Sequence, residues 1–362
     1  MNSESTRVVV AMSGGVDSSV SAALLVEAGY DVVGVMMRLW AEESGPDSPA
    51  NRCCTPDQMA DARRVAALLD IPFYVVDMQA AFKQHVVDFF LDSYRAGVTP
   101  NPCLSCNRHI RFTHLLQHAL ALDAEFLATG HYARVAQAEN GTLQLLKGVD
   151  PAKDQSYVLS VLRQDQLAHA MFPVGSHTKA EVRALAERFG LPVASKGESQ
   201  DLCFLADGDY RRFLRDHTPE LIAPGPIVNQ AGEVLGQHSG LPNYTIGQRK
   251  GLGIAAPEPL YVLRTEPARN ALVVGYRAEL GDERLRVSGV NWIAGTAPDG
   301  PVRAGVKIRY KAREVPATIT PLADGGAEVV FDQPVRDATP GQGAVFYDGE
   351  WVLGGGVIGR QD

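Results

Sequence analysis

Short apolar runs alternate with amphipathic segments along residues 1–210. The apolar runs have the length and composition of strands, and they lie at residues 7–12, 31–39, 73–78 and 125–130. Apolar positions at helical spacing predict helices between and after these runs, at residues 18–27, 57–69, 80–95 and 111–122. This alternation predicts a doubly wound α/β domain with a parallel sheet, whose ligands bind at the carboxyl ends of the strands.

The pattern changes after residue 130. Asn140-Gly141 lies between two strand-like stretches, residues 134–137 and 142–146, which predicts a β-hairpin. A helix is expected at residues 155–162. The capping-box pattern Thr178-Lys179-Ala180-Glu181 predicts the start of another helix, which ends at Gly190.

The remainder of the chain is β-like. Residues 219–259 are rich in Gly and Pro and lack helical periodicity. Beyond Leu260, short strand-like stretches are separated by turn residues, at residues 261–264, 272–274, 306–310, 317–319, 328–331 and 344–347. Such spacing is typical of a small β-barrel. We therefore expect a catalytic domain (1–210), a central linker or adaptor domain (211–280) and a C-terminal β-barrel domain (281–362).

Composition and charge narrow the class of protein. Of 362 residues, 45% are hydrophobic and 21% are charged, and the net charge is −8. No apolar run is long enough to span a bilayer and residues 1–7 lack a signal-peptide pattern, so a cytoplasmic protein without a membrane partner is expected. The acidic balance argues mildly against nucleic acid as a partner. On a strand, however, the alternating Lys307, Arg309, Lys311 and Arg313 would share one face, either a solvated surface or a binding face.

The most informative stretch, Ser13-Gly14-Gly15-Val16-Asp17-Ser18-Ser19, joins the first predicted strand to the first predicted helix. A glycine-rich turn at a helix N-terminus presents backbone N–H groups and the positive end of the helix dipole to an anion, and Ser13, Ser18 and Ser19 add hydroxyl donors. The stretch matches neither the Walker nor the dinucleotide pattern. Its S-G-G-x-D-S string resembles the pyrophosphatase loop (PP-loop) of adenylating enzymes that cleave ATP between the α and β phosphates. The alternative is a plain connecting turn.

The cysteines carry the second signal. Cys103 and Cys106 follow Pro100-Asn101-Pro102, so we expect them in a defined turn that leads into the helix at Arg111. With Arg108 and His109 beside them, these thiols are expected to have a depressed pKa, as nucleophiles do. Cys203 lies much further along, in a loop of polar and small residues, and would join them only through folding.

Other uses of the five cysteines are less favoured. An odd number in a reducing compartment does not indicate a disulfide framework. Structural zinc would need two C-x-x-C halves, and the chain has one. The adjacent Cys53 and Cys54 are more typical of small residues in or beside a core.

Six motifs in order along nearly the whole chain resemble those of the bacterial tRNA-specific 2-thiouridylases of the MnmA type. They are the loop at residues 13–18, Thr99-Pro100-Asn101-Pro102 with Cys106-Asn107, residues 128–133, Lys153-Asp154-Gln155-Ser156-Tyr157, the Cys203 loop and residues 244–253. The resemblance implies an N-terminal PP-loop domain like that of the adenine nucleotide α-hydrolases, a small central domain and a C-terminal β-barrel. It also implies thiolation at C2 of the wobble uridine, position 34, in tRNAs for Lys, Glu and Gln.

By this resemblance, ATP binds with Mg²⁺ on its phosphates at residues of the loop and beside it, namely Ala11, Met12, Ser13, Gly14, Gly15, Val16, Asp17, Ser18, Met37 and Gly130. Adenylation makes the uracil O2 a leaving group. Cys203 carries a persulfide whose terminal sulfur attacks C2. Cys106 attacks that persulfide to release the sulfur, which leaves a Cys106–Cys203 disulfide for a reductant to reset.

The resemblance also implies partners. Asn101, Pro102 and Cys103 would contact the target base, and other tRNA contacts would come from His131, Lys153, Asp154, Gln155, Arg309, Tyr310 and Gln342. This favours a binding face for the alternating basic strand. The base is expected to be flipped out, because C2 of a stacked uridine is inaccessible. A sulfur-donor protein, either a relay protein or a cysteine desulfurase, is a further expected partner, and the enzyme is expected to be a monomer.

One position departs from the family pattern. An aspartate is common where this chain has Cys103, and an acid there could serve as a general base. As an alternative to the favoured persulfide route, Cys103, Cys106 and Cys203 would hold a [4Fe-4S] cluster with one open iron. Two rival functions stay open: another PP-loop synthetase that activates a small-molecule oxygen, and a non-catalytic, metal-bearing RNA-binding module.

Overall fold

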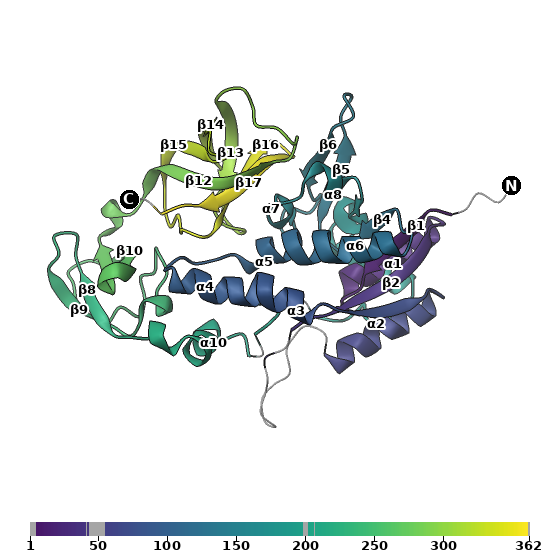
Figure 1. Cartoon of the computed structure of the whole chain (residues 1–362), viewed down its shortest axis with the longest axis horizontal. Coiled ribbons are helices and arrows are strands. Elements are labelled where there is room, and N and C mark those ends of the chain that lie inside the picture. Colours follow the sequence, from purple (N-terminus) through teal and green to yellow (C-terminus); the bar gives the residue numbers. More distant parts are fainter. Residues whose placement is uncertain (1–4, 41, 43–54, 198–201, 206, 361–362) are drawn as a thin grey trace.

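The computed structural model describes residues 5–40, 42, 55–197, 202–205 and 207–360. Cys53 and Cys54, which the sequence places in or beside a core, lie outside the described residues, and so does part of the Cys203 loop (198–201). Among the helices of the described ranges, none is both long and apolar enough to cross a bilayer. The chain forms three sheets that are linked by helices (Figure 1).

A five-stranded parallel sheet forms the N-terminal part. Its strands lie in the order β3-β2-β1-β4-β7, with bounds β1 Arg7–Ala11, β2 Asp31–Arg38, β3 Phe73–Asp77, β4 Phe126–Ala128 and β7 Ala170–Met171. Successive side chains of the buried strand β1 point to opposite faces. Val8 and Val10 therefore pack in one apolar cluster and Val9 in another. The sheet is covered on both faces, which confirms the doubly wound prediction.

Helices of the N-terminal part divide between the two faces. The cluster of Val8 and Val10 includes residues of α1 (Val16–Glu27), α2 (Pro56–Leu68) and α9 (Lys179–Arg188). The cluster of Val9 includes two long helices that extend toward the other sheets (Figure 1). The first comprises α3 Gln79–Phe82, η1 Lys83–Asp88 and α4 Phe89–Arg95, and the second comprises α5 Pro102–Ser105, η2 Cys106–Leu115 and α6 Leu116–Ala121. Both middle segments, η1 and η2, are π-helical.

The second long helix begins at Pro102, well before the predicted start at Arg111. Asn101 caps it, because its Oδ1 accepts the backbone N–H groups of Cys103 (3.1 Å) and Leu104 (3.3 Å). Pro102 occupies the first helical position, where a missing N–H costs no hydrogen bond. The prediction of a turn at Cys103 and Cys106 is therefore wrong: both lie on the helix.

The predicted hairpin is confirmed as β5 (Ala133–Gln137) and β6 (Leu143–Lys147). The helix predicted at residues 155–162 is shorter: α7 covers Ser156–Leu159. The Ser160 hydroxyl donates to the carbonyl of Tyr157 (2.9 Å), the group that a continued helix would use. α8 (Gln164–Leu167) and a 3₁₀ turn, η3 (Pro173–Ser176), follow.

A four-stranded sheet forms the central part. Its strands lie in the order β10-β11-β8-β9, with bounds β8 Gly225–Val228, β9 Val234–His238, β10 Tyr261–Glu266 and β11 Ala271–Gly275. The helical pieces around it are α10 Tyr210–His217 and the 3₁₀ turns η4 Pro219–Leu221, η5 Leu241–Asn243, η6 Pro267–Arg269 and η7 Arg277–Glu279. The sequence did not predict α10, which Asp209 caps through Arg211 N–H (3.0 Å) and Arg212 N–H (3.2 Å).

The C-terminal part is a closed antiparallel barrel. Its strands follow the order β12-β15-β14-β13-β16-β17, and β12 pairs with β17 to close it. The bounds are β12 Asp282–Trp292, β13 Val302–Lys307, β14 Val315–Pro321, β15 Ala327–Val335, β16 Gly343–Asp348 and β17 Trp351–Ile358. The β5–β6 hairpin extends this sheet, because Leu145 and Leu146 pair with Val352 and Trp351. The barrel is thus fastened to the N-terminal domain.

The basic alternation does not lie on one strand. β13 ends at Lys307, and Arg309, Lys311 and Arg313 belong to the loop that leads to β14. Lys307 lies 3.5 Å from Asp154, and Arg309 pairs with Asp337 (2.9 Å). The prediction of a single basic strand face is therefore wrong, because the strand ends before its period can align these side chains.

Candidate active site

The loop at residues 13–18 joins β1 to α1 at the carboxyl end of the parallel sheet, as predicted. Its turn is braced internally: Ser13 N–H donates to the Ser18 hydroxyl (3.2 Å), and the Ser18 and Ser19 hydroxyls donate to the Gly15 carbonyl (3.2 and 2.8 Å). Both hydroxyls were expected to serve as anion donors. They lie on buried residues and shape the loop instead, whereas Ser13 is exposed.

Two glycines let neighbouring segments approach this loop. Gly14 has a φ of +71°, and a Cβ there would lie 2.3 Å from the carbonyl oxygen of Gln58. A Cβ on Gly130, which follows β4, would lie 2.7 Å from the backbone nitrogen of Ser18. Any side chain at either position would displace the turn, so the loop has a fixed shape.

Two lysines from distant segments surround the loop. Lys179, the first residue of α9, donates to Asp17 Oδ1 (2.6 Å), and the Tyr132 hydroxyl donates to the same oxygen (2.7 Å). Lys196 donates to the Gly14 carbonyl (2.9 Å) and to Asp61 Oδ2 (2.8 Å). Positive charge beside a turn of backbone N–H groups suits a polyphosphate. The sequence analysis missed both roles, because only folding brings these lysines to the loop.

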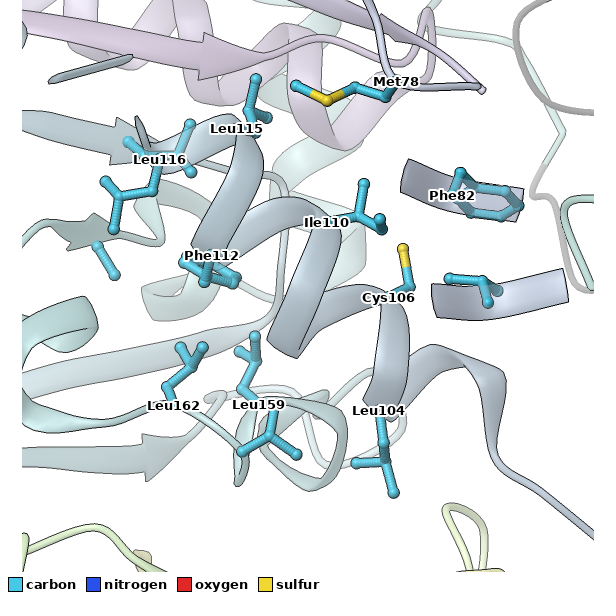
Figure 2. Packing of buried hydrophobic residues seen from close by; sticks show 14 of the residues in the cluster. Met78, Phe82, Leu104, Cys106, Ile110, Phe112, Leu115, Leu116, Leu159 and Leu162 are labelled. Carbon is cyan, nitrogen blue, oxygen red and sulfur yellow. The ribbon is translucent and has the colours of Figure 1, made fainter. Parts of the chain in front are cut away.

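The two helical cysteines differ in environment. Cys106 begins the π-helical segment, is only 4% exposed, and points toward Phe82 and Ile110 (Figure 2). Cys103 lies one turn earlier and is exposed. These two cysteines and Cys203 are free thiols. Cys106, Phe82, Ile110 and Phe204 belong to one large buried apolar cluster, which we call the thiol cluster.

The depressed pKa predicted for these thiols is wrong. Burial raises the pKa of Cys106, and the positive charge of Arg111 opposes that shift only in part. The pKa of Cys103 is also raised, first by the protein atoms around it and then by Cys106, although its side chain keeps solvent contact. Burial and the neighbouring His85 lower the pKa of His109, so that ring supplies no charge at neutral pH. Desolvation therefore outweighs the helix N-terminus.

Arg111 is the cation that both thiols share. Its Nη1 donates to Asn107 Oδ1 (2.9 Å), and Asn107 Nδ2 donates to the carbonyl of Val158 (3.0 Å). Arg111 follows Cys106 by five residues within a π-helical segment, whose bonds run from i to i+5, so the two residues lie one turn apart. The sequence analysis named Arg111 only as a helix start, because no local pattern shows which charge faces a buried thiol.

Cys203 joins the same cluster from far along the chain. It is half-buried and packs against the thiol cluster. The ring of the next residue, Phe204, lies 6.3 Å from that of Phe82 and 5.3 Å from that of Phe90. Cys106 points toward Phe82 (Figure 2), and Phe82 is the ring that Phe204, the neighbour of Cys203 in sequence, packs against.

The C-terminal barrel holds the segment that precedes Cys103. Gln342 Nε2 donates to the carbonyls of Thr99 (2.9 Å) and Pro100 (3.1 Å), and Thr99 N–H donates to the carbonyl of Pro340 (2.9 Å). These bonds fix the approach to Asn101, the helix cap. Gln342, a predicted tRNA residue, is therefore engaged with the protein itself.

Tyr157 of α7 is the centre of a group of predicted tRNA residues. Its hydroxyl donates to the carbonyl of Gly343 (2.9 Å), and its ring lies 6.1 Å from that of Tyr310. Burial raises the pKa of Tyr157, while its hydrogen bonds and the charge of Arg309 oppose the shift. Tyr157 interacts with Asn101 through a side-chain hydrogen bond and with Arg309 and Cys103 through their charges. Its ring contacts that of Tyr310. The structure thus gathers residues from three separate motifs.

Two other predicted tRNA residues make internal bonds. Asp154 is buried and accepts the backbone N–H groups of Gly148 and Ser156, both at 3.1 Å. Gln155 Oε1 accepts the backbone N–H of Tyr132 (3.0 Å). In this conformation their acceptor oxygens shape the protein rather than face a ligand.

His131 is also internal. Its residue is 9% exposed, and its ring packs against those of Phe112 and Phe172, with ring centroids 6.4 and 6.1 Å away. Its Nδ1 lies 2.7 Å from Thr129 Oγ1. Burial lowers the pKa of His131 to about 3, so the ring is neutral at physiological pH. This geometry does not offer the predicted contact between His131 and tRNA.

The residues present do not fit an iron–sulfur cluster. Within the part of the chain that the structure describes, no group of three or more His, Cys, Asp or Glu side chains is arranged to hold a metal ion. Cys106 points into apolar surroundings while Cys103 is exposed.

Mg²⁺ requires different ligands, because it usually binds through substrate phosphates and one or two carboxylates. Asp17 is the carboxylate of the loop.

A parallel-sheet domain with a braced S-G-G-x-D-S loop and two lysines beside that loop defines a nucleotide-dependent enzyme of the PP-loop class. Family models agree: residues 6–207 match a tRNA methyl transferase HUP domain, residues 211–276 a tRNA methyl transferase PRC-barrel domain, and residues 282–358 an aminomethyltransferase beta-barrel domain. Among solved structures, a 4-thiouridine synthetase–RNA complex with bound ATP has a TM-score of 0.35 at 16% identity, covering 59% of this chain and 51% of that chain.

Relatives that match over nearly the whole chain show the family to which the protein belongs. The chain is 53% identical over 352 residues to the tRNA-specific 2-thiouridylase MnmA of Magnetococcus marinus, covering 97% of this chain and 98% of that protein. It is 52% identical over 363 residues to that of Geotalea uraniireducens, covering 99% and 96%. The chain belongs to the family of tRNA-specific 2-thiouridylases.

Proposed function

We propose that this chain replaces the C2 oxygen of the wobble uridine, position 34, in tRNAs for Lys, Glu and Gln by sulfur. ATP activates the oxygen, and the products are 2-thiouridine, AMP and pyrophosphate. Family membership supports the class of reaction. The single observation that carries the assignment is that Cys106 and Cys203 adjoin one cluster in a protein that also has a PP-loop.

In the first step, the loop at residues 11–18 binds the phosphates, and Met37 and Gly130 lie beside the adenosine. The uracil O2 attacks the α-phosphorus, and pyrophosphate leaves. Lys179 and Lys196 stabilise the negative charge that develops on the leaving pyrophosphate. Mg²⁺ held by the phosphates and Asp17 would supply further charge neutralisation there.

In the second step, Cys203 carries the sulfur as a persulfide. The terminal sulfur attacks C2, and the Cys106 thiolate attacks Sγ of Cys203. The persulfide S–S bond breaks, the terminal sulfur stays on C2, AMP departs with the former O2, and a Cys106–Cys203 disulfide forms. Cys106 is only 4% exposed and burial raises its pKa, so the proposal includes exposure of this thiol when tRNA binds.

The tRNA binds across the N-terminal domain (1–210), the central domain (211–280) and the barrel (281–362). Asn101, Pro102 and Cys103 contact the flipped base, and the surface residues Lys153, Arg309 and Tyr310 contact the surrounding tRNA. His131, Asp154, Gln155 and Gln342 act by holding the surfaces that make these contacts. The enzyme works in the cytoplasm as a monomer, and a sulfur-donor protein loads Cys203.

The test is incubation of the protein with ATP, Mg²⁺, a persulfide donor and unmodified tRNA for Lys, followed by nucleoside mass analysis. We expect 2-thiouridine at the wobble position. Cys53→Ser provides a matched control, because it makes the same substitution at a cysteine without a role in the proposal. ATP cleavage with a small-molecule acceptor that Cys106→Ser and Cys203→Ser leave intact would instead identify another synthetase. Chelator-sensitive activity with a broad visible absorption band after anaerobic purification would restore the cluster alternative.

A further inference from the structure

We propose that Cys103 is the resolving cysteine of this enzyme. Its thiolate attacks Sγ of Cys106 in the Cys106–Cys203 disulfide, which frees Cys203 and leaves a Cys103–Cys106 disulfide. This role rests on the proposed function, because that reaction produces the disulfide. It adds a step after 2-thiouridine has formed. It also identifies Cys103 as the residue that an external thiol attacks when it reduces the enzyme for the next turnover.

The first argument is access. A disulfide between Cys106 and Cys203 forms within the thiol cluster, where Cys106 is 4% exposed and Phe82 and Phe204 pack together. Thiol–disulfide exchange requires the attacking thiolate to reach a sulfur atom, so the buried Cys106 sulfur is a poor target for an external reductant and the half-buried Cys203 sulfur is only partly open to one. Cys103 is exposed. Transfer of the disulfide to Cys103 brings it to the surface.

The second argument is helix geometry. Cys103 and Cys106 lie three residues apart on one helix, which Asn101 caps and Pro102 opens. Cα atoms at this spacing are about 5 Å apart, within the ~4.4–6.8 Å range that disulfides span. Cysteines three apart at a helix start are the arrangement of dithiol oxidoreductases, whose two sulfurs exchange readily. Because Cys103 is exposed and Cys106 points inward, the bond needs rotation of both side chains and a shift of the backbone in the first helical turn.

The third argument is charge. Burial is the main cause that raises the pKa of Cys103, and the positive charge of Arg111 lowers it. Arg111 also lowers the pKa of Cys106 against the effect of burial. Ionisation of Cys103 is therefore assisted by a positive charge that is still present when Cys106 is part of a disulfide. Arg111 is fixed for this purpose by its bond to Asn107 (2.9 Å).

The exchange balances without an oxidant. The electron pair of the Cys103 thiolate forms the new bond to Cys106, and the pair of the broken Cys106–Cys203 bond leaves on Cys203. Cys203 then takes up a proton, which replaces the one that Cys103 gave up. A small thiol or dithiol attacks the exposed Cys103 and reduces the new disulfide, at the cost of its own oxidation.

Peptide mapping after one turnover tests this sequence. The enzyme is loaded with persulfide on Cys203, given ATP and tRNA without reductant, quenched in acid, alkylated and digested with trypsin. Cleavage after Arg95 and Arg108 places Cys103 and Cys106 in one peptide, residues 96–108, and Cys203 in another, residues 197–211. We expect peptide 96–108 to become lighter by two hydrogen atoms and unlinked, while Cys203 becomes alkylated.

Cys103→Ser is the companion variant, at an exposed position. It is expected to retain the cross-link between the two peptides and, with reductant present, to slow later turnovers relative to the first. A persistent cross-link in the wild type, alongside 2-thiouridine, would overturn the resolving role alone. Fragment ions that link Cys103 directly to Cys203 would overturn it too, because Cys103 would then be the nucleophile. Absence of 2-thiouridine would remove the proposed function and this role together.

Discussion

The PP-loop and the thiol cluster differ in how ready they are for chemistry. The loop has a fixed turn, an exposed Ser13 and two lysines held by short bonds to Asp17 and Gly14. Cys106 instead lies in apolar surroundings that raise its pKa. A phosphate site can be preformed, because backbone donors are inert until an anion arrives. A thiolate reacts with many electrophiles and oxidants, so keeping it protonated until the substrate binds protects it.

Bonded residues connect the two regions. Asp17 accepts the hydroxyl of Tyr132, and the backbone N–H of Tyr132 donates to Gln155. Gln155 directly precedes α7, which carries Tyr157 to Asn101 and the barrel. The nucleotide loop and the segment leading to Cys103 are therefore parts of one framework. Because the two regions carry out different steps, we expect substitutions in the PP-loop to slow pyrophosphate release without changing the reactivity of the thiols. Substitutions of the thiols should stop sulfur transfer without stopping pyrophosphate release.

The largest expected effect is at the thiols. Cys106→Ser and Cys203→Ser should each lower 2-thiouridine formation by about 10³-fold or more, because the covalent step loses its sulfur nucleophile or carrier. The measurement is nucleoside mass analysis after multiple turnovers. Pyrophosphate release from ATP in the presence of tRNA should persist in both variants. Undiminished thiolation in either variant would contradict the assignment.

Asp17→Asn tests the PP-loop. Asp17 Oδ1 holds both Lys179 and Tyr132, so the variant should slow pyrophosphate release by about 10²- to 10³-fold. The rate at which iodoacetamide alkylates Cys106 should not change. Asp31→Asn is the control, because this half-buried carboxylate of the same domain pairs with Arg7 (2.7 Å) and not with a residue of the loop. Equal loss in both variants would show that the effect is general instability.

Arg111→Gln tests the charge that the thiols share. Arg111 favours the thiolate and so lowers the pKa of Cys106 against the effect of burial. Its loss should raise that pKa further, and the pH profile of Cys106 alkylation should move upward by about one pH unit. Arg111→Lys should retain most of the wild-type profile. Arg163→Gln, which removes an exposed arginine paired with Asp165, should leave the profile in place; the same shift in that variant would refute a specific role for Arg111.

The smallest expected effect is at the barrel contact. Gln342→Ala removes two hydrogen bonds to the carbonyls of Thr99 and Pro100. Each such bond contributes about 1 kcal/mol, so KM for tRNA should rise several-fold with little change in kcat. Steady-state thiolation at varied tRNA concentration measures both constants. Gln333→Ala, at an exposed position of the same barrel, should alter neither, and an unchanged KM in Gln342→Ala would show that the 99–101 segment needs no support from the barrel.

The sequence predicted those features that depend on local pattern. The first four strands of the parallel sheet follow from apolar runs, and the PP-loop follows from its glycines between a strand and a helix. Both signals lie within a few adjacent residues. The chain order of the motifs then indicated the family before any fold was known.

Features that depend on folding were missed or wrong. No pattern near Lys179, Lys196 or Arg111 shows that they reach the loop or the thiols, because their partners are distant in sequence. The thiol pKa was predicted in the wrong direction, since helix position is visible in a sequence and burial is not. The sequence predicted a turn at Cys103 and Cys106 before a helix at Arg111, whereas Asn101 caps a helix that begins at Pro102.

The central claim is that the loop and the thiols act in succession on one uridine. It is tested most directly by a single-turnover reaction with persulfide-loaded enzyme, tRNA and ATP labelled on the α-phosphate. We predict that AMP and 2-thiouridine form in equal amounts, and that Cys203→Ser accumulates label on the tRNA instead. Formation of 2-thiouridine without a matching amount of AMP, or a Cys203→Ser reaction in which no label ever joins the tRNA, would contradict the account.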